Sequence, residues 1–167
     1  MRSWKGNVAS TEVWTLDSAE APLRQSMGRL LVQTDGIGFY DISQEVSDWL
    51  GQVGVRDGLL TIFMRHTSAG LTIQENADPD VLFDLKTAMD RLAPENGPWR
   101  HTIEGPDDMP AHIKSVMTGV QLQIPVLVGQ LDLGTWQGIY VAEYRRPPHR
   151  RSLTFVYQGT HIADAPL

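Results

Sequence analysis

The sequence predicts an α+β fold, with several helices packed on largely antiparallel sheets. Strand-like segments outnumber helical ones, and the two kinds do not alternate strictly along the chain, a pattern typical of this class. At 167 residues the chain is long enough for one domain with a single substantial core. No repeat, low-complexity segment or linker divides it, so we expect residues 1–167 to form a single domain.

Four elements are expected in the first part of the chain. Residues 12–17 and 28–34 have the pattern of strands. Asp41 or Ser43 can cap a short helix whose apolar residues recur at helical spacing. Those residues are Val46, Trp49, Leu50 and Val53, and Gly51 and Gly54 end the helix. A buried central strand is indicated at residues 58–65, because the run GLLTIFMR is continuously apolar.

An extended segment at residues 71–76 precedes the next helix. Its side chains alternate between two faces, with Leu71, Ile73 and Glu75 on one and Thr72, Gln74 and Asn76 on the other. Asp78 caps the helix, and Pro79 takes its first position. The buried stripe of this helix is expected to comprise Val81, Leu82, Leu85, Met89 and Leu92.

A further helix and three strands complete the expected fold. Asp107 or Asp108 caps the helix, and Gly119 ends it. Strand-like segments follow at residues 121–128, 138–144 and 152–158.

Composition narrows the class of function. The chain has no cysteine, so disulfides, thiolate zinc sites and thiol nucleophiles are excluded, and any metal must be held by His, Asp or Glu. A net charge of -6 disfavours nonspecific nucleic-acid binding, which needs a broad basic face. No apolar run approaches the length of a membrane span, and the first residues have no apolar signal region. We therefore expect a cytoplasmic protein that binds neither nucleic acid nor membrane.

Four arginines form a local exception to this acidic composition. Arg145, Arg146, Arg150 and Arg151 flank Pro147, Pro148 and His149. The segment suits a solvated loop between two strands as well as it suits an anion site. Four arginines are too few to track a nucleic-acid duplex.

A dense polar segment, HTSAGLTIQEN, is the first candidate site. It combines His66, Ser68, Glu75 and Asn76 with a short apolar stretch. Polar residues that crowd onto short, well-formed elements usually belong to a site. His66 also stands at the end of a buried strand, where catalytic groups are common, although a lone histidine there is more often structural.

The segment PDDMPAHIK is the second candidate site. It carries Asp107, Asp108 and His112, and His101 lies just upstream. Asp108 and His112 are four residues apart, so they share a helix face if the helix has begun by Asp108. Both aspartates could instead simply cap the helix. With His66, the histidines could hold zinc or a similar divalent ion, or transfer protons around a phosphate ester.

The segment LGTWQG adds two residues suited to a heterocyclic ligand. Trp136 offers a flat face on which a ring can stack, and Gln137 offers an amide that can form hydrogen bonds with the edge of a heterocycle. An aromatic residue buried at a strand start explains Trp136 equally well, whereas Gln137 is harder to explain that way.

Three segments resemble the motifs of the YjbQ family, which is often described as secondary thiamine-phosphate synthase. They are HTSAGLTIQENADPDVLFDL, then EGPDDMPAHIKSVMTG preceded by His101, then IPVLVGQLDLGTWQGIYVAEYRR. The match runs in order from about Ser26 to Gly159. Trp99, where the family tends to have tyrosine, and the proline-rich RPPHRR loop depart from the pattern.

The resemblance implies a compact, sandwich-like α+β fold, a homotrimer, and a weak or secondary thiamine-phosphate synthase activity. It also implies one polar pocket, built from His66, Glu75, Asn76, His101, Asp107, Asp108, His112 and Gln137.

The implied reaction joins a pyrimidine diphosphate to a thiazole phosphate and expels pyrophosphate. Such a site needs cationic or metal support for the phosphates and room for two flat rings. We expect catalytic roles for Glu75, Asp107, Asp108 and His66, and substrate contacts from Ser68, Asn76, Trp136, Gln137, Arg145 and Arg151. A divalent metal, zinc or magnesium, is expected on His66, His101 and His112. Histidine ligands suit a transition metal better than magnesium, which prefers oxygen.

Two classes of function fit these residues. One is an enzyme that acts on a small phosphorylated molecule, and the other is a noncatalytic oligomer that binds a metal or a small ligand. The convergence of so many ionisable groups favours the enzyme.

Overall fold

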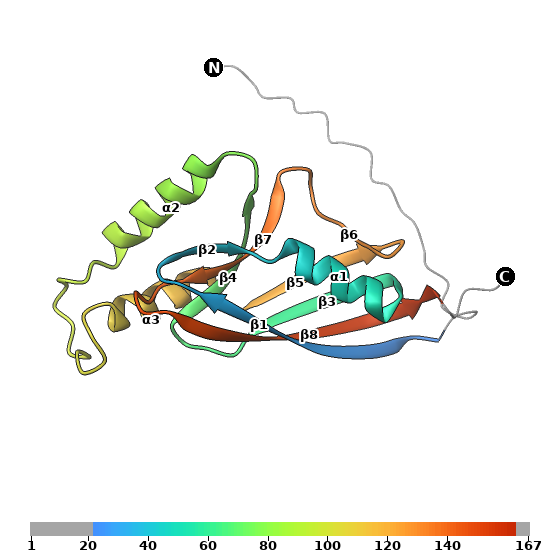
Figure 1. Cartoon of the computed structure of the whole chain (residues 1–167), viewed down its shortest axis with the longest axis horizontal. Helices are drawn as coiled ribbons and strands as arrows, with labels where there is room; N and C mark the ends of the chain where they lie inside the picture. Colours follow the sequence, from blue (N-terminus) through green and yellow to red (C-terminus); the bar gives the residue numbers. More distant parts are fainter. Residues whose placement is uncertain (1–21, 163–167) are drawn as a thin grey trace, which may run out of the picture.

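The computed structural model describes residues 22–162. The strands are β1 (Arg24–Thr34), β2 (Gly38–Asp41), β3 (Val55–Met64), β4 (Ala69–Glu75), β5 (Gln121–Leu127), β6 (Gln130–Leu131), β7 (Gln137–Glu143) and β8 (His149–His161). The helices are α1 (Ser43–Val53), α2 (Pro79–Leu92) and α3 (Asp108–Thr118). The strands pair antiparallel (Figure 1), which confirms the α+β class. The strand expected at residues 12–17 lies outside the described residues.

Two sheets and one helix enclose the main core. The strand order is β1-β8-β3-β5-β6 in the larger sheet and β2-β7-β4 in the smaller one. Buried apolar side chains from both sheets and from α1 form one contiguous cluster. Its members include Val46, Leu50, Leu60, Ile62, Leu71, Ile139, Leu153, Phe155 and Tyr157. This arrangement agrees with the sandwich-like fold that the resemblance implied.

Strand β8 shows how the sequence pattern produces the larger sheet. Leu153, Phe155 and Tyr157 are buried, and the residues between them are more exposed, as expected when successive side chains point to opposite faces. Strand β8 extends beyond the expected 152–158 because all of β1 pairs with it. Thr34 lies opposite His149, and Arg24 lies opposite Gly159. The short strands β2 and β6 are not apparent from the sequence.

The first helix is bounded by local hydrogen bonds and by one glycine. A side-chain oxygen of Asp41 accepts a hydrogen bond from the Ser43 N–H at 2.8 Å. Gly54 ends the helix in the left-handed region, with φ 68°, where glycine carries no steric penalty. Gly51, also expected at the end, lies inside the last turns of the helix.

Helix α2 begins as the sequence predicts but packs differently. Asp78 accepts a hydrogen bond from the Asp80 N–H at 2.9 Å, and Pro79 opens the helix. The expectation of a buried stripe is wrong within this chain, because none of the helix residues is buried and Leu92 is 63% exposed. Figure 1 shows the reason: α2 stands away from the larger sheet at one end of the molecule.

The turn between β5 and β6 has an unusual backbone. Val128 has φ 50° and Gly129 has φ 81°, the combination that a tight two-residue hairpin turn requires. The Val128 N–H donates to Asp57 Oδ1 at 2.7 Å, and the Gly129 N–H donates to the Arg56 carbonyl at 2.7 Å. These bonds hold a β-branched residue in a region that such residues rarely occupy.

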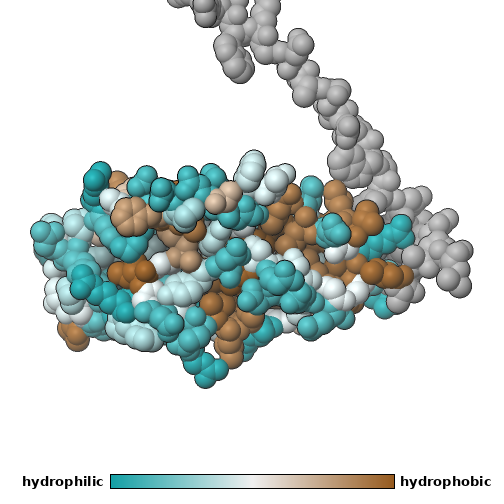
Figure 2. Space-filling view, turned by 45° about the horizontal axis from the view of Figure 1, so that its top comes forward, coloured by the Kyte–Doolittle hydropathy of each residue, from teal (hydrophilic) through white to brown (hydrophobic). Residues whose placement is uncertain are grey.

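No helix among residues 22–162 is long and apolar enough to cross a membrane. Apolar side chains nevertheless reach the surface in several places, as the space-filling view shows (Figure 2). Large exposed apolar residues include Met27, Leu31, Phe83, Leu92 and Trp136.

Candidate metal centre

Two histidines converge on one buried aspartate at the start of α3. Asp108 and His112 lie one helical turn apart, and His101 comes from the loop before the helix. Asp108 Oδ2 lies 2.6 Å from His101 Nε2 and 3.3 Å from His112 Nε2. One ligand atom from each of the three residues lies within 4.8 Å of the others, a spacing compatible with a shared metal ion. Asp108 is 1% exposed, whereas the side chains of His101 and His112 are 42% and 33% exposed, so the group opens to solvent.

The protonation pattern of His112 is set by a main-chain contact. Its Nδ1 lies 2.9 Å from the carbonyl oxygen of Thr67. Since a carbonyl can only accept, Nδ1 carries the hydrogen, and the lone pair of a neutral ring resides on Nε2. Such a contact commonly orients a metal-binding histidine. The loop between β3 and β4 therefore orients the His112 ring and leaves Nε2 free to bind a metal ion.

Arg145 holds the two aspartates in place. Its Nε donates to Asp107 Oδ2 at 3.1 Å, its Nη1 donates to Asp108 Oδ1, and its Nη2 donates to the Glu104 carbonyl at 2.7 Å. Neither aspartate side chain caps α3, because Asp107 makes no such bond and the Asp108 oxygens face Arg145 and the histidines. The guanidinium of Arg145 is thus engaged with internal acceptors, and only 11% of the side chain is exposed.

The ionisation of Asp107 follows from the same contacts. Burial alone would raise the pKa of this carboxyl. The hydrogen bonds from the Arg146 main-chain N–H, at 2.8 Å, and from Arg145 outweigh burial and lower the pKa below its ordinary value. Asp107 therefore remains a carboxylate at neutral pH.

A fully buried ion pair supports the backbone from which Arg145 extends. Glu143 Oε2 accepts from Arg151 Nε at 2.6 Å and from Thr34 Oγ1 at 2.8 Å. Glu143 Oε1 accepts from the main-chain N–H groups of Tyr144 and Arg145, at 3.0 and 2.9 Å. Burial would raise the pKa of Glu143, but these hydrogen bonds, led by Arg151, lower it.

His66 lies outside the group formed by His101, Asp108 and His112. Its Nε2 accepts a hydrogen bond from the Ser152 N–H at 2.8 Å. Burial, and then the positive charge of Arg151, lower the pKa of His66. Ser68 contributes its carbonyl, which lies 3.5 Å from Arg151 Nη2. His66 and Ser68 therefore both contact β8. The lowered pKa of His66 favours the neutral form of its ring.

The remaining expected site residues lie at the other end of the smaller sheet. Strands β4 and β7 pair from Ala69 opposite Glu143 to Glu75 opposite Gln137. Glu75 lies six positions along β4 from Ala69, which corresponds to about 20 Å at about 3.3 Å per residue. The single pocket that the resemblance implied is therefore divided, within one chain, into two separate clusters.

Local hydrogen bonds shape that second cluster. The Asn76 N–H donates to the Trp136 carbonyl at 3.0 Å, and its Nδ2 lies 3.4 Å from the Gln137 carbonyl. Gln137 Oε1 accepts from the Gly134 N–H at 2.8 Å, which folds the loop on itself. Trp136 is 64% exposed, so it is not an aromatic residue buried at a strand start.

A family model described as "UPF0047 protein YjbQ-like" matches residues 29–160. The chain belongs to the YjbQ-like UPF0047 family. UPF0047 protein sll1880 of Synechocystis is 46% identical over 143 residues, which are 85% of this chain and 97% of that protein. UPF0047 protein YjbQ of Salmonella typhimurium is 45% identical over 123 residues, which are 73% of this chain and 89% of that protein.

Solved structures of YjbQ-like proteins have the same fold. An uncharacterised YjbQ/UPF0047 protein from Clostridium acetobutylicum is 39% identical, with a TM-score of 0.70 over 79% of this chain and 98% of that one. A YbjQ-like protein of unknown function from Sulfolobus solfataricus has a TM-score of 0.77 over 83% of this chain and 99% of that one. At 24% identity, the second likeness shows the fold alone.

Two structural roles in this YjbQ-like chain were not inferred from its sequence. One is that of Glu143, whose only signal is an acidic residue within the apolar run GIYVAEY. The other is that of Arg145, which binds aspartates 37 and 38 residues upstream. Both depend on strand pairing and on the position of α3, which no local pattern encodes.

Proposed function

We propose that His101, Asp108 and His112 hold a divalent transition metal, and that the chain is a metal-dependent enzyme acting on a small phosphorylated molecule. The observation that carries this proposal is the approach of two imidazole Nε2 atoms to one carboxylate oxygen, on a face open to solvent. Catalytic zinc sites commonly use three such protein ligands and leave one position for water or substrate.

The donor set favours zinc or a similar ion over magnesium. Magnesium prefers oxygen ligands, whereas imidazole nitrogens suit zinc and other transition metals. Only Asp108 offers oxygen in the group. Of the two metals considered from the sequence, zinc is the better fit.

Hydrogen bonds with surrounding residues would hold the metal ligands in a fixed orientation. Arg145 occupies Asp108 Oδ1 and leaves Oδ2 toward the histidines. Thr67 fixes the ring of His112. A divalent ion at this position would supply positive charge for a phosphate group and would acidify a bound water.

The finer proposal is a secondary thiamine-phosphate synthase activity, and it rests on the family resemblance. Expulsion of pyrophosphate requires compensation of negative charge. Because Arg145 and Arg151 are bound to internal carboxylates, the metal is the better candidate for that task.

Elemental analysis of the purified protein tests the metal proposal. We expect zinc or a similar metal in the wild type and in His66→Ala, and a large loss in His101→Ala and His112→Ala. His66→Ala is the matched control, because it removes a histidine that lies outside the group. Equal metal content in all four proteins would refute the ligand assignment.

A growth assay tests the activity. In a strain that lacks its main thiamine-phosphate synthase, the wild type should restore growth without thiamine, and His112→Ala should not. If the wild type binds metal but neither restores growth nor forms product in vitro, the noncatalytic binding function is favoured instead.

A further inference from the structure

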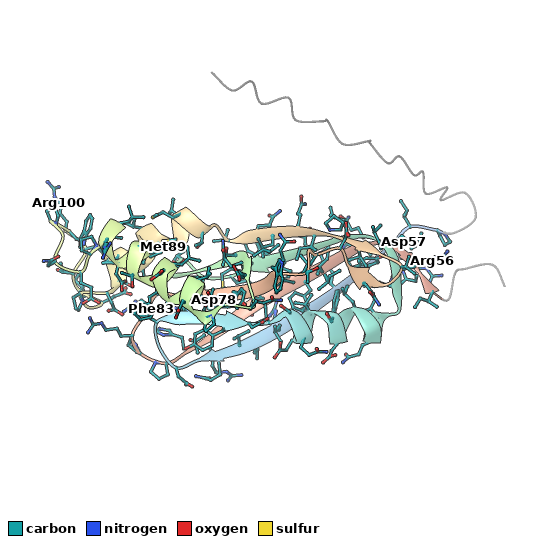
Figure 3. The ribbon with its side chains drawn as sticks, turned by 90° about the horizontal axis from the view of Figure 1, so that it is seen from above. Arg56, Asp57, Asp78, Phe83, Met89 and Arg100 are labelled. Atoms are coloured by element: carbon teal, nitrogen blue, oxygen red, sulfur yellow. The ribbon has the colours of Figure 1, made fainter. Side chains whose placement is uncertain are left out.

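A second polar cleft lies beside α2, α3 and β2, away from the metal centre. Its inner part is narrow, with about 10 Å³ of free space, and is lined by apolar atoms of Phe39, Met89 and Tyr144 and by charged groups of Lys86, Asp90 and Lys114. An outer part of about 870 Å³, its open mouth included, continues past Pro94 toward Arg146. Met89 is labelled on α2 in Figure 3, near the end of the molecule opposite Arg56.

Lys114 is the buried cation of this cleft. It lies on α3, two residues after His112, and therefore about 200° around the helix from that ligand. Only 3% of the residue is exposed. Its Nζ lies 2.6 Å from Asp90 Oδ1 on α2. An ammonium group has three N–H donors, and this contact uses one of them.

The charges in the cleft do not balance. Asp90 is shared by two ammonium groups, because Lys86 Nζ lies 3.3 Å from its other carboxylate oxygen. Burial would raise the pKa of Asp90, but Lys114 and then Lys86 lower it, so the carboxyl stays ionised.

The other charged residues of the lining are already paired. Arg146 donates to both carboxylate oxygens of Glu95 at 2.9 Å, and Glu143 is paired with Arg151. One positive charge is thus left over, shared between the buried Lys114 and the half-exposed Lys86, in a chain with a net charge of -6. An anion in the cleft would balance this charge and accept hydrogen bonds from the remaining N–H donors of Lys114.

We propose that the cleft binds a small organic oxyanion, a carboxylate or a phosphate monoester, between Lys114 and Lys86. Charge-assisted hydrogen bonds from the two ammonium groups would hold the oxyanion. The outer part of the cleft, beside Ala93 and Pro94, would hold the body of the ligand. The site requires no metal, so it is independent of the function proposed for the metal centre.

Calorimetric titration of the full-length protein with inorganic phosphate and, separately, with benzoate tests this proposal. We expect saturable binding of at least one probe to the wild type. Lys114→Met should weaken binding at least about tenfold, the loss expected when a charge-assisted hydrogen bond is removed. Lys86 is half-exposed, so Lys86→Met should not disturb folding, and it should weaken binding several-fold. Binding of phosphate alone would indicate a phosphate monoester, and binding of benzoate alone a carboxylate.

Two control variants make the outcome specific. Arg56→Met removes a half-exposed cation at the opposite end of the molecule and should leave binding unchanged (Figure 3). His112→Ala identifies any anion that binds at the metal centre instead: a loss of binding in that variant but not in the lysine variants would place the anion there and overturn the proposal. Equal binding by wild type, Lys86→Met and Lys114→Met, or no binding by the wild type, would show that Lys114 and Asp90 only join the two helices.

Discussion

Arg145 sets the geometry of the metal centre through one planar group. Its guanidinium reaches Asp107, Asp108 and the Glu104 carbonyl at the same time. A lysine at this position would carry the same charge, but its ammonium cannot reproduce the planar fork of donors. The direction of Asp108 therefore depends on the shape of the Arg145 side chain as well as on its charge.

We expect Arg145→Lys to lower metal affinity by about 10- to 100-fold, the usual effect of losing a residue that orients a ligand. The variant should also lose about 3 kcal/mol or more of unfolding free energy, because two buried carboxylates lose hydrogen bonds. Metal titration and urea unfolding measure the two effects.

Arg146→Lys is the matched control for that variant. The contact of Arg146 with Asp107 uses its main-chain N–H, and its side chain pairs with Glu95 at the surface. It should lose less than about 1 kcal/mol. Equal behaviour of the two variants would contradict an orienting role for Arg145.

His66 should make stability depend on pH in the weakly acidic range. Its pKa lies below the ordinary value of 6.5, because burial and the charge of Arg151 disfavour protonation. The unfolded chain then binds the proton more readily, so the free energy of unfolding is highest above pH 6.5 and falls as pH drops toward the folded pKa. Urea unfolding at a series of pH values measures this fall, and His66→Gln should remove it. An NMR titration that gives His66 a pKa of 6.5 or more would refute the explanation.

At the scale of elements, α3 carries the metal ligands and rests on β4 at Gly70. A Cβ at Gly70 would collide with Thr118 Oγ1 and would meet the Gly119 carbonyl at 3.0 Å. The Leu71 N–H also donates to that carbonyl, at 3.1 Å. The end of α3 thus approaches β4 closely only because residue 70 has no side chain.

We expect Gly70→Ala to cost about 1–3 kcal/mol of unfolding free energy and to weaken metal binding, since α3 must shift. Gly51→Ala is a matched control on α1, where a Cβ meets nothing within 4 Å. It should stabilise the protein by about 0.5–1 kcal/mol, the helical advantage of alanine. Thermal unfolding compares the two, and a neutral Gly70→Ala would contradict the packing argument.

The elements that the sequence predicts well are those with their own local signals. Asp78 and Pro79 mark the start of α2, and the apolar run after residue 57 marks β3. The four residues of β2 have no such signal, because their strand character comes from pairing with β7. The exposure of α2 could not be inferred either, since helical periodicity shows which face is apolar but not what covers it.

The candidate site was partly predictable for a similar reason. Helical spacing alone places Asp108 and His112 on one face, and the structure adds His101 to them. The distance between this group and Trp136 follows instead from the register of β4 and β7. A motif gives the order of residues along the chain, and only the register gives their separation.

At the scale of the whole molecule, the exposed side chains agree with an assembled protein. Phe83 and Leu92 on α2 are 67% and 63% exposed, and Trp136 is 64% exposed. Large exposed apolar surfaces often mark contacts between proteins. The homotrimer implied by the family resemblance remains our proposal for the assembly.

Light scattering at micromolar concentration should give about three times the chain mass of 18.6 kDa. A closed ring of copies is the usual form of such an assembly. Phe83→Ser and Ala88→Ser offer a matched pair on α2, because both residues are exposed but only Phe83 is large. A mass of one chain for the wild type would exclude the trimer.

The turn at Val128 offers a means of separating loss of chemistry from loss of folding. A left-handed conformation costs an ordinary residue roughly 1–2 kcal/mol, and asparagine tolerates it far better. Val128→Asn should therefore act as a suppressor, which offsets a destabilisation elsewhere without contact with either cluster. A metal-centre variant can then be combined with Val128→Asn. If the combination restores activity, the original variant had lost activity because it was unstable. If the combination restores only the melting temperature, the original variant had lost a group that the chemistry needs.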